Sequence, residues 1–264
     1  MALVINDDNW ENAIRDLSGD DHGTGYIRRD RSLWPVASAP RSKAFDIPLI
    51  PRSEWSARIA EMEKNQSNLR HILERHRIAS LNQRSTNYCW TFGVVTAITA
   101  IRAAANQPYV DLSPASVAAP IKNYRNYGGW GGEALEYIIE NGICSTEYWP
   151  ATAIERRYDN EDSRANRKHH LVTEWYDIDC GDDSCFDAVM TCVLLNLPVA
   201  VGYNWWSHEV CAIYPVDKGN GKYALGCRNS WGDDYGDHGF FELEGRRAIP
   251  SDAVVPIVFT GAVS

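Results

Sequence analysis

The chain has 264 residues, 44% of them hydrophobic and 23% charged, which is the composition of a folded globular protein and excludes disorder along the whole chain. The net charge of −9 arises entirely after residue 80, and this acidic balance argues against nucleic acid as a partner. No apolar stretch approaches the roughly 18 residues that a membrane span needs, so we expect no membrane partner. The first ten residues lack the basic and apolar regions of a secretory signal, which predicts a cytoplasmic location.

The chain begins with a segment of weak periodicity. Residues 1–46 mix charges with Gly and Pro, so they are expected to form an N-terminal extension whose order depends on the surface beneath it. Residues 47–54 contain two prolines and should be extended. The pattern then becomes helical from Glu54 to Ile78, with Ser53 as a possible N-cap.

Two further helices are predicted before residue 170. Residues 89–105 are apolar on all sides and almost free of charge, as in a helix that is buried on most of its surface. A helix over residues 132–140 should stop at Asn141 and Gly142, which form a C-cap signal.

After about residue 170 short apolar runs alternate with turn residues, the pattern of antiparallel strands. One helix is expected among them, over residues 185–195. The predicted strands cover residues 171–178, 197–205, 208–216, 222–231 and 239–244. A helical first half and a β second half predict an α+β fold, with the functional site at the seam between the two.

The hairpin formed by residues 208–216 and 222–231 brings a histidine to an asparagine. The turn-rich loop between these strands predicts that Cys211 faces Cys227 and that His208 lies opposite Asn229. An asparagine oxygen can hold one ring nitrogen of an imidazole and leave the other free for chemistry. A histidine satisfied within a strand is the alternative interpretation of His208.

Cys89 begins the buried helix, where the helix dipole and unpaired N–H groups favour thiolate over thiol. Such a cysteine can be a nucleophile, although a small core residue is the commoner role. Gln83, six residues earlier, carries an amide that could reach an oxyanion beside the backbone N–H of Cys89.

Together these residues resemble the active-site motifs of papain-like (C1 family) cysteine peptidases over about residues 47–264. Each motif is weak by itself, but their order along the chain is that of the family. The motifs are Asn82-Gln83 with Asn87-Tyr88-Cys89-Trp90-Thr91-Phe92, Leu112-Ser113, Gly131-Gly132, Gly142-Ile143, His208, Asn229-Ser230-Trp231-Gly232, Gly236 and Gly239-Phe240.

The resemblance implies a papain-like fold, with a helical subdomain around a buried central helix, a β-barrel-like antiparallel subdomain and the active site in the cleft between them. It implies that Cys89 is the nucleophile and His208 the base that later protonates the leaving amine. Asn229 would orient His208, Trp231 would shield that hydrogen bond, and Gln83 with the Cys89 N–H would hold the oxyanion. The implied activity is endopeptidase hydrolysis through a thioester.

The same resemblance suggests substrate-binding residues. Gly131 and Gly132 precede a helix, and Gly132 would offer its backbone to an extended peptide. Glu133 could favour a basic side chain, with a solvated carboxylate at a helix start as the alternative. Trp206 would form a wall of the subsite before the scissile bond, and Tyr88 would narrow the cleft.

The organisation departs from that of secreted family members. The long inhibitory propeptide is not recognisable in residues 1–46, which we expect to be a belt or short pro-segment packed across a catalytic domain of residues 47–264. That domain would divide into a mainly helical part, residues 47–170, and a mainly β part, residues 171–264. These features resemble intracellular bacterial and phage-type homologues.

Seven cysteines leave at least one thiol unpaired. We expect Cys211 and Cys227 to remain free thiols, as in a reducing compartment. Cys180 and Cys185 could close a small loop, but the same argument favours free thiols there. Cys180 and Cys185, with His169 and His170 upstream, match structural zinc spacing poorly, so we expect neither a metal nor a cofactor.

Two alternatives to a peptidase remain open. The same Cys-His pair could transfer an acyl group to amines or cleave peptidoglycan cross-links, because these reactions share a thioester intermediate. The chain could also be a catalytically silent module that binds a peptide or partner in the cleft. The expected partner is a peptide or protein substrate, and the net charge of −9 favours a basic one. The sequence does not predict an oligomeric state.

Overall fold

The computed structural model describes residues 2–17, 22–170 and 172–258. In these residues one mixed sheet of eight strands runs in the order β1-β7-β6-β5-β4-β8-β3-β2. The strands are β1 (Val4–Ile5), β2 (Ser42–Ala44), β3 (Val172–Ile178), β4 (Val199–Tyr203), β5 (His208–Gly219), β6 (Lys222–Arg228), β7 (Phe240–Glu244) and β8 (Asp252–Val258).

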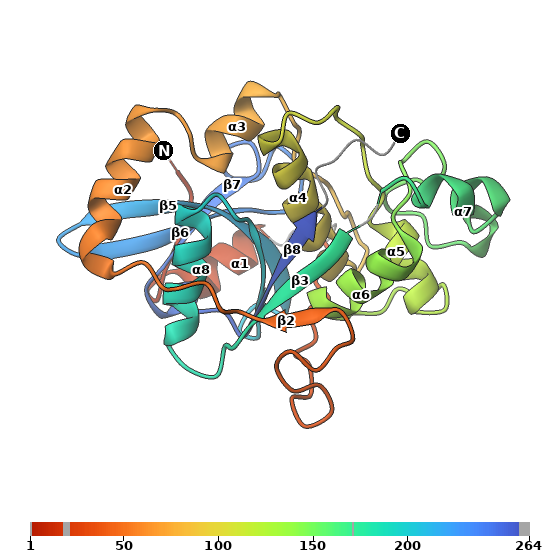
Figure 1. Ribbon diagram of the computed structural model, residues 1–264, viewed down its shortest axis with the longest axis horizontal. Helices are drawn as coiled ribbons and strands as arrows, with labels where there is room; N and C mark the ends of the chain where they lie inside the picture. The colour runs from red at the N-terminus through yellow and green to blue at the C-terminus, as the bar shows by residue number, and fades with distance from the viewer. Residues whose placement is uncertain (1, 18–21, 171, 259–264) are drawn as a thin grey trace.

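The helices lie mainly before the sheet in sequence. Helices α2 and α8 lie towards one end of the molecule and α5, α6 and α7 towards the other (Figure 1). The helices are α1 (Trp10–Leu17), α2 (Arg52–Lys64), α3 (Leu69–Arg75), α4 (Cys89–Ala104), α5 (Ala115–Ile121), α6 (Gly131–Asn141), α7 (Glu161–Arg167) and α8 (Ser184–Leu194), with 3₁₀ turns at Arg156–Tyr158 and Gly245–Ala248.

Helix α4 is the buried helix that its apolar sequence predicts. It packs against β4, β5 and β8 of the sheet on one side and against α3, α5 and α6 on the other. Its first seven residues, from Cys89 to Val95, are all buried. Because α4 lies between the helices and the sheet, its N-terminus places Cys89 at the seam between them.

Both edges of the sheet are covered by the N-terminal extension. Strand β1 pairs in parallel with β7, and β2 pairs in parallel with β3 at the opposite edge. Unpaired edge strands expose backbone donors and acceptors, which these short strands satisfy. The extension is therefore held at two points far apart in the sheet.

The predicted helix from Glu54 to Ile78 is wrong as a single element. Helix α2 ends at Lys64, and α3 starts at Leu69 after Asn68, whose side chain accepts a hydrogen bond from the backbone N–H of His71. Asparagine competes with helical backbone bonding and caps the second helix instead. The start also differs, because Pro51 rather than Ser53 is the N-cap of α2.

The remaining predicted elements are present with small shifts. The predicted helix stop at Gly142 is confirmed, since Gly142 is the C-cap of α6 with a φ of 76°. Leu171, the first residue of one predicted strand, lies outside the described residues, and β3 is described from Val172. Strand β8 was not predicted from the sequence.

The cysteines differ from expectation at one pair. Cys180 and Cys185 form a disulfide, so the expectation that both are free is wrong in this structure. The hairpin register is displaced by one residue, with Cys211 facing Arg228 and Ala212 facing Cys227. Cys211 and Cys227 are therefore on opposite faces of the sheet, and both are free thiols, as expected.

Within the described residues, no helix is both long enough and apolar enough to cross a membrane. In the same residues no group of three or more histidine, cysteine or carboxylate side chains is arranged to hold a metal ion.

Candidate active site

Cys89 lies at the N-terminus of α4 with no exposed surface. As the first helical residue it has a backbone N–H without an acceptor inside the helix. Burial raises the pKa of the Cys89 thiol to about 12, with a smaller contribution from the nearby Glu209 carboxyl, while backbone N–H groups including that of Gly25 act in the opposite direction. The thiol is therefore protonated in this arrangement.

His208 and Asn229 meet as a hydrogen-bonded pair. Nε2 of His208 lies 2.8 Å from Oδ1 of Asn229, and both side chains are buried. The other ring nitrogen, Nδ1, has no hydrogen-bond partner among the described residues. Burial lowers the pKa of His208 to about 4, although the bond to Asn229 acts against this. Asn229 thus holds one ring nitrogen and leaves Nδ1 free.

Two tryptophans enclose the His208 imidazole. The ring centroids of Trp206 and Trp231 each lie 4.8 Å from that of His208. Trp206 itself is buried against Trp231 and Phe241, so it supports the histidine from within the core. The role of Trp206 as a wall of a substrate subsite stays a prediction, because its ring contacts are those of the covered state.

Gln83 is fixed by hydrogen bonds at both ends of its side-chain amide. Its Oε1 accepts a hydrogen bond of 2.6 Å from the hydroxyl of Ser230. Its Nε2 donates to the carbonyl oxygens of Thr86 at 2.7 Å and Gly23 at 2.8 Å. These hydrogen bonds hold the side-chain amide of Gln83 in one orientation. Its N–H donor is bound by a carbonyl of the chain's own N-terminal extension.

Residues 22–31, which we call the covering segment, cross the site. The backbone N–H of Tyr26 donates to the carbonyl of Ser207, and that of Ile27 donates to Gly129. The N–H of Gly129 in turn donates to the carbonyl of Gly25. The covering segment is therefore bonded through its main chain to the residue before His208 and to the loop before α6.

Two glycines let the covering segment lie this close. A Cβ atom added to Gly23 would stand 2.1 Å from the carbonyl oxygen of Thr86, and one added to Gly25 would stand 2.1 Å from that of Asn87. Neither distance is compatible with a side chain. On the far side of Gly23, the ring of His22 stacks on Trp231 with centroids 5.1 Å apart.

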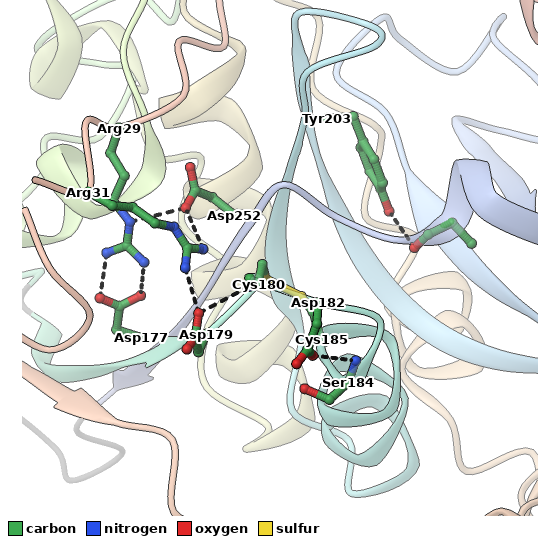
Figure 2. Close-up of a disulfide and its surroundings, with 12 residues drawn as sticks. Arg29, Arg31, Asp177, Asp179, Cys180, Asp182, Ser184, Cys185, Tyr203 and Asp252 are labelled. Carbon is green, nitrogen blue, oxygen red and sulfur yellow. Dashed lines mark hydrogen bonds and ion pairs between the residues drawn. A yellow bond between two sulfur atoms is a disulfide. The ribbon is translucent and has the colours of Figure 1, made fainter.

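Beyond the cleft, side chains anchor the covering segment to the sheet. The Tyr26 hydroxyl donates to Asp252 at 2.6 Å. Arg29 makes a bidentate ion pair with Asp177, with nitrogen–oxygen distances of 2.5 and 2.8 Å, and both side chains are almost fully buried. Figure 2 shows the Arg29 guanidinium between the carboxylates of Asp177 and Asp252.

The predicted substrate-binding glycines, Gly131 and Gly132, lie beside the glycine that the covering segment meets. Tyr26 of the covering segment pairs with Gly129. Gly131 instead donates its backbone N–H to the buried Glu209 carboxylate. Gly132 is buried, and a Cβ atom added to it would stand 2.2 Å from the ring of Trp130. One Gly-Gly pair, Gly128-Gly129, precedes Trp130 and another, Gly131-Gly132, follows it, and it is the first pair that meets the covering segment.

Two other predicted substrate-binding residues are occupied elsewhere. Glu133 forms an ion pair with Lys122, at 2.5 Å, and so is not free to meet a basic side chain. Tyr88 is buried as the N-cap of α4, and its hydroxyl donates to the carbonyl of Arg125. Trp231, by contrast, lies at the cleft beside His208 and His22.

The comparisons with known proteins agree with this geometry. The model of the papain family of cysteine proteases matches residues 70–257. Cathepsin L 1 of Paramecium tetraurelia is 28% identical over 62% of this chain and 54% of its own length. The oryzain gamma chain of Oryza sativa is 27% identical over 59% of this chain and 49% of its own. The chain thus spans about half the length of these curated relatives.

Solved structures share the fold. Xylellain, a cysteine protease from Xylella fastidiosa, superposes with a TM-score of 0.63 at 15% identity, covering 90% of this chain and 97% of its own. The bromelain protease of Ananas comosus superposes with a TM-score of 0.57 at 20% identity, covering 73% of this chain and 98% of its own. This α+β chain has the papain-like fold and belongs to the papain family of cysteine proteases.

Proposed function

We propose that this protein is a cysteine endopeptidase that hydrolyses peptide bonds through Cys89 and His208. The observation that carries the proposal is the hydrogen bond from Gln83 Nε2 to the carbonyl oxygen of Gly23. In this contact a fixed donor beside the N-terminus of α4 binds a peptide carbonyl. A substrate carbonyl in that place would have the Cys89 sulfur within reach.

In the proposed reaction the imidazole of His208 accepts and donates every transferred proton. His208 Nδ1 takes the proton of the Cys89 thiol, and the thiolate attacks the carbonyl carbon. Gln83 Nε2 and the Cys89 N–H stabilise the oxyanion, which is worth about 10²–10³ in rate per donor. His208 then protonates the leaving amine, and a water deprotonated by the same nitrogen cleaves the thioester and restores the thiol.

Activity requires the covering segment to leave the cleft. With the segment in place the thiol and the imidazole are both buried and neutral, and the donor of Gln83 is occupied. We propose that residues 1–46 act as a belt or gate, since β1 and β2 tie this region to both edges of the sheet. The alternative is that self-cleavage before about residue 47 removes the N-terminal extension. Limited proteolysis with mass spectrometry would detect this cleavage.

The finer assignments are also part of the proposal. The extent of the superposition on xylellain supports a bacterial or phage-type homologue, and the five free cysteines support a cytoplasmic location. The disulfide of Cys180 and Cys185 is the feature that opposes this location. Thiol counting on denatured protein taken directly from the cell tests it: seven reactive thiols support a reducing compartment, and five argue against one.

The central experiment is labelling of Cys89 with an epoxysuccinyl reagent at pH 6, followed by mass spectrometry. A Gly25→Ala variant, in which the covering segment no longer fits, should label selectively at Cys89 and cleave peptides. His208→Ala in that background should lose both, while His170→Ala serves as the matched histidine control. Slow, equal labelling of several cysteines would instead favour the silent binding module. Transfer of the acyl group to an added amine rather than to water would favour the acyl transferase.

A further inference from the structure

A row of aromatic rings connects the N-terminal helix to His208. The ring of Trp10, the first residue of α1, meets that of Trp205 edge to face, with centroids 5.7 Å apart. Trp205 stacks on Trp206 at 5.4 Å, and Trp206 lies 4.8 Å from the imidazole of His208. We call these four rings the aromatic row, because each ring contacts the next.

Arg247 holds the outer end of the aromatic row. Its guanidinium lies 4.0 Å from the ring centroid of Trp10 and 5.4 Å from that of Trp205. It also lies 3.6 Å from one carboxylate oxygen of Asp7, and the other oxygen accepts a hydrogen bond of 3.0 Å from the backbone N–H of Arg246. Arginine stacks on aromatic faces and pairs with carboxylates. Residues 246 and 247 of the catalytic domain therefore fix the position of Trp10.

The anchors of α1 differ from those of the covering segment. Strand β1, which precedes α1, pairs with β7, and α1 packs against the hydrophobic core through Ile14. The covering segment is bonded instead to Gly129, Ser207 and Asp177. Residues 22–31 can therefore leave the cleft while α1 keeps its contacts.

The turn within the aromatic row needs this support most when the site is open. It joins β4 to β5 over residues 204–207 and leads directly into His208. Ser207 has a φ of 50°, in the left-handed region that non-glycine residues seldom adopt. Its carbonyl accepts a hydrogen bond from the backbone N–H of Tyr26, which is lost when the covering segment leaves. The ring contacts then carry more of the stability of the turn.

The orientation of the His208 ring matters for the proposed function, on which this inference rests, because Nδ1 must meet the Cys89 thiol. Asn229 fixes the ring at Nε2 alone. Contacts with Trp206 and Trp231 limit rotation of the ring about that bond. A displacement of about 1 Å at a reacting group can lower a rate about 10²-fold, so a loosened Trp206 should slow the chemical step.

We infer that Trp10 is a positioning residue for the catalytic histidine and that it acts through Trp205 and Trp206. Helix α1 therefore belongs to the active enzyme, and the part of the N-terminal extension that must leave the cleft is the covering segment alone. Release of residues 1–46 as a whole would remove the outer end of the aromatic row and slow catalysis.

The test compares Trp10→Ala with Trp10→Phe in the full chain carrying Gly25→Ala. Cleavage of one fluorogenic peptide is measured, and the concentration of active sites is titrated with an epoxysuccinyl reagent. We expect Trp10→Ala to lower kcat per titrated site about 10-fold while KM changes less than about 2-fold. Trp10→Phe keeps a ring against Trp205 and should recover most of kcat. A merely structural role would lower the number of titrated sites and leave kcat per site unchanged, which would overturn the inference.

Two variants serve as matched controls. Trp34→Ala removes a tryptophan of the same extension that is 44% exposed. Ile14→Ala weakens the packing of α1 but keeps Trp10. Both should retain kcat per titrated site. A fall in Ile14→Ala as large as that in Trp10→Ala would assign the effect to the docking of α1 in general and would overturn the role of Trp10.

If Cys89 is unreactive and the Gly25→Ala chain cleaves no peptide, the proposed function fails separately. The positioning of His208 is then judged without activity. Exchange of the C2 proton of the His208 imidazole in deuterated solvent, measured by mass spectrometry, reports how closely the ring is enclosed. Trp10→Ala should exchange at least about 3-fold faster than Trp34→Ala. Equal exchange rates in these two variants would overturn the inference.

Discussion

The carbonyl oxygen of Gly23 accepts a hydrogen bond of 2.8 Å from the side-chain amide of Gln83. A donor expected to stabilise an oxyanion is thus occupied by a ground-state carbonyl from the same chain. The contact connects the N-terminal extension to the chemistry of the site, because access of a substrate and release of the covering segment compete for one amide group.

Replacing Gly25 with alanine should open the site. The added Cβ atom would stand 2.1 Å from the carbonyl oxygen of Asn87, in rigid backbone at the start of α4. Overpacking of this kind costs about 1–3 kcal/mol, so the rate of Cys89 alkylation should rise about 5- to 150-fold. Ser38→Ala, an exposed change in the same extension, is the control. Equal alkylation rates in the variant and the control would contradict the proposal that the covering segment occludes Cys89.

Arg29→Ala should destabilise the protein far more than Arg31→Ala. Arg29 pairs with Asp177 where both side chains are 1% exposed, and its loss leaves a buried carboxylate uncompensated, which costs about 3–5 kcal/mol. Arg31 pairs with Asp179, whose side chain is 68% exposed, and lies 3.6 Å from Asp252. Asp252 keeps Arg29 at 3.1 Å when Arg31 is removed, so this change should cost only about 1 kcal/mol. Urea unfolding of both variants at pH 7 measures the difference, and similar midpoints would argue against a buried anchor.

Acid should loosen the covering segment. The pKa of His208 lies near 4 in the covered state, below its ordinary value of 6.5, chiefly because the ring is buried. Protonation therefore favours the uncovered state, and the stability of the cover is lost as the pH falls from 6.5 towards 4. Between pH 7.5 and 5.5 the opening equilibrium should increase about 10-fold.

Hydrogen exchange of a peptide spanning residues 22–31, corrected for the intrinsic effect of pH, measures this opening. His208→Gln should remove most of the acid dependence while keeping the side chain polar. Unchanged protection of the wild-type segment at pH 5.5 would count against the histidine as the titrating group.

Gln83→Glu separates the oxyanion donor from the nucleophile. In the Gly25→Ala background it should lower kcat for peptides by about 10²–10³. Alkylation of Cys89 by iodoacetamide, which forms no oxyanion, should continue at nearly the same rate. A parallel loss of both would mean that Gln83 acts through the structure of the Cys89 site instead.

The sequence predicted the chemistry-bearing positions through local patterns. An uncharged apolar run predicted the buried α4 with Cys89 at its start, and alternating strands predicted a hairpin that brings His208 to Asn229. The register was displaced by one residue, yet the side-chain bond is present because Asn229 follows the end of β6 and reaches back to the ring. Local patterning thus predicted the contact although the backbone pairing differed.

Other features depend on packing between distant segments. Two Gly-Gly pairs flank Trp130, and only the position of the covering segment shows that Gly129 is the one that pairs with an extended chain. Glu133 is an acidic residue beside a glycine in sequence, but Lys122, 11 residues away, neutralises it in the fold.

By itself the sequence determined the fold class and the order of Cys89, His208 and Asn229, because hydrophobic periodicity and helix or hairpin signals act over a few residues. Only the tertiary structure decided that residues 22–31 cover the site and that Asp177, Glu209 and Asp252 form its acidic end. Those carboxylates come from three different strands, which become neighbours only when the sheet assembles. Their shared burial is a property that no single segment of the chain possesses.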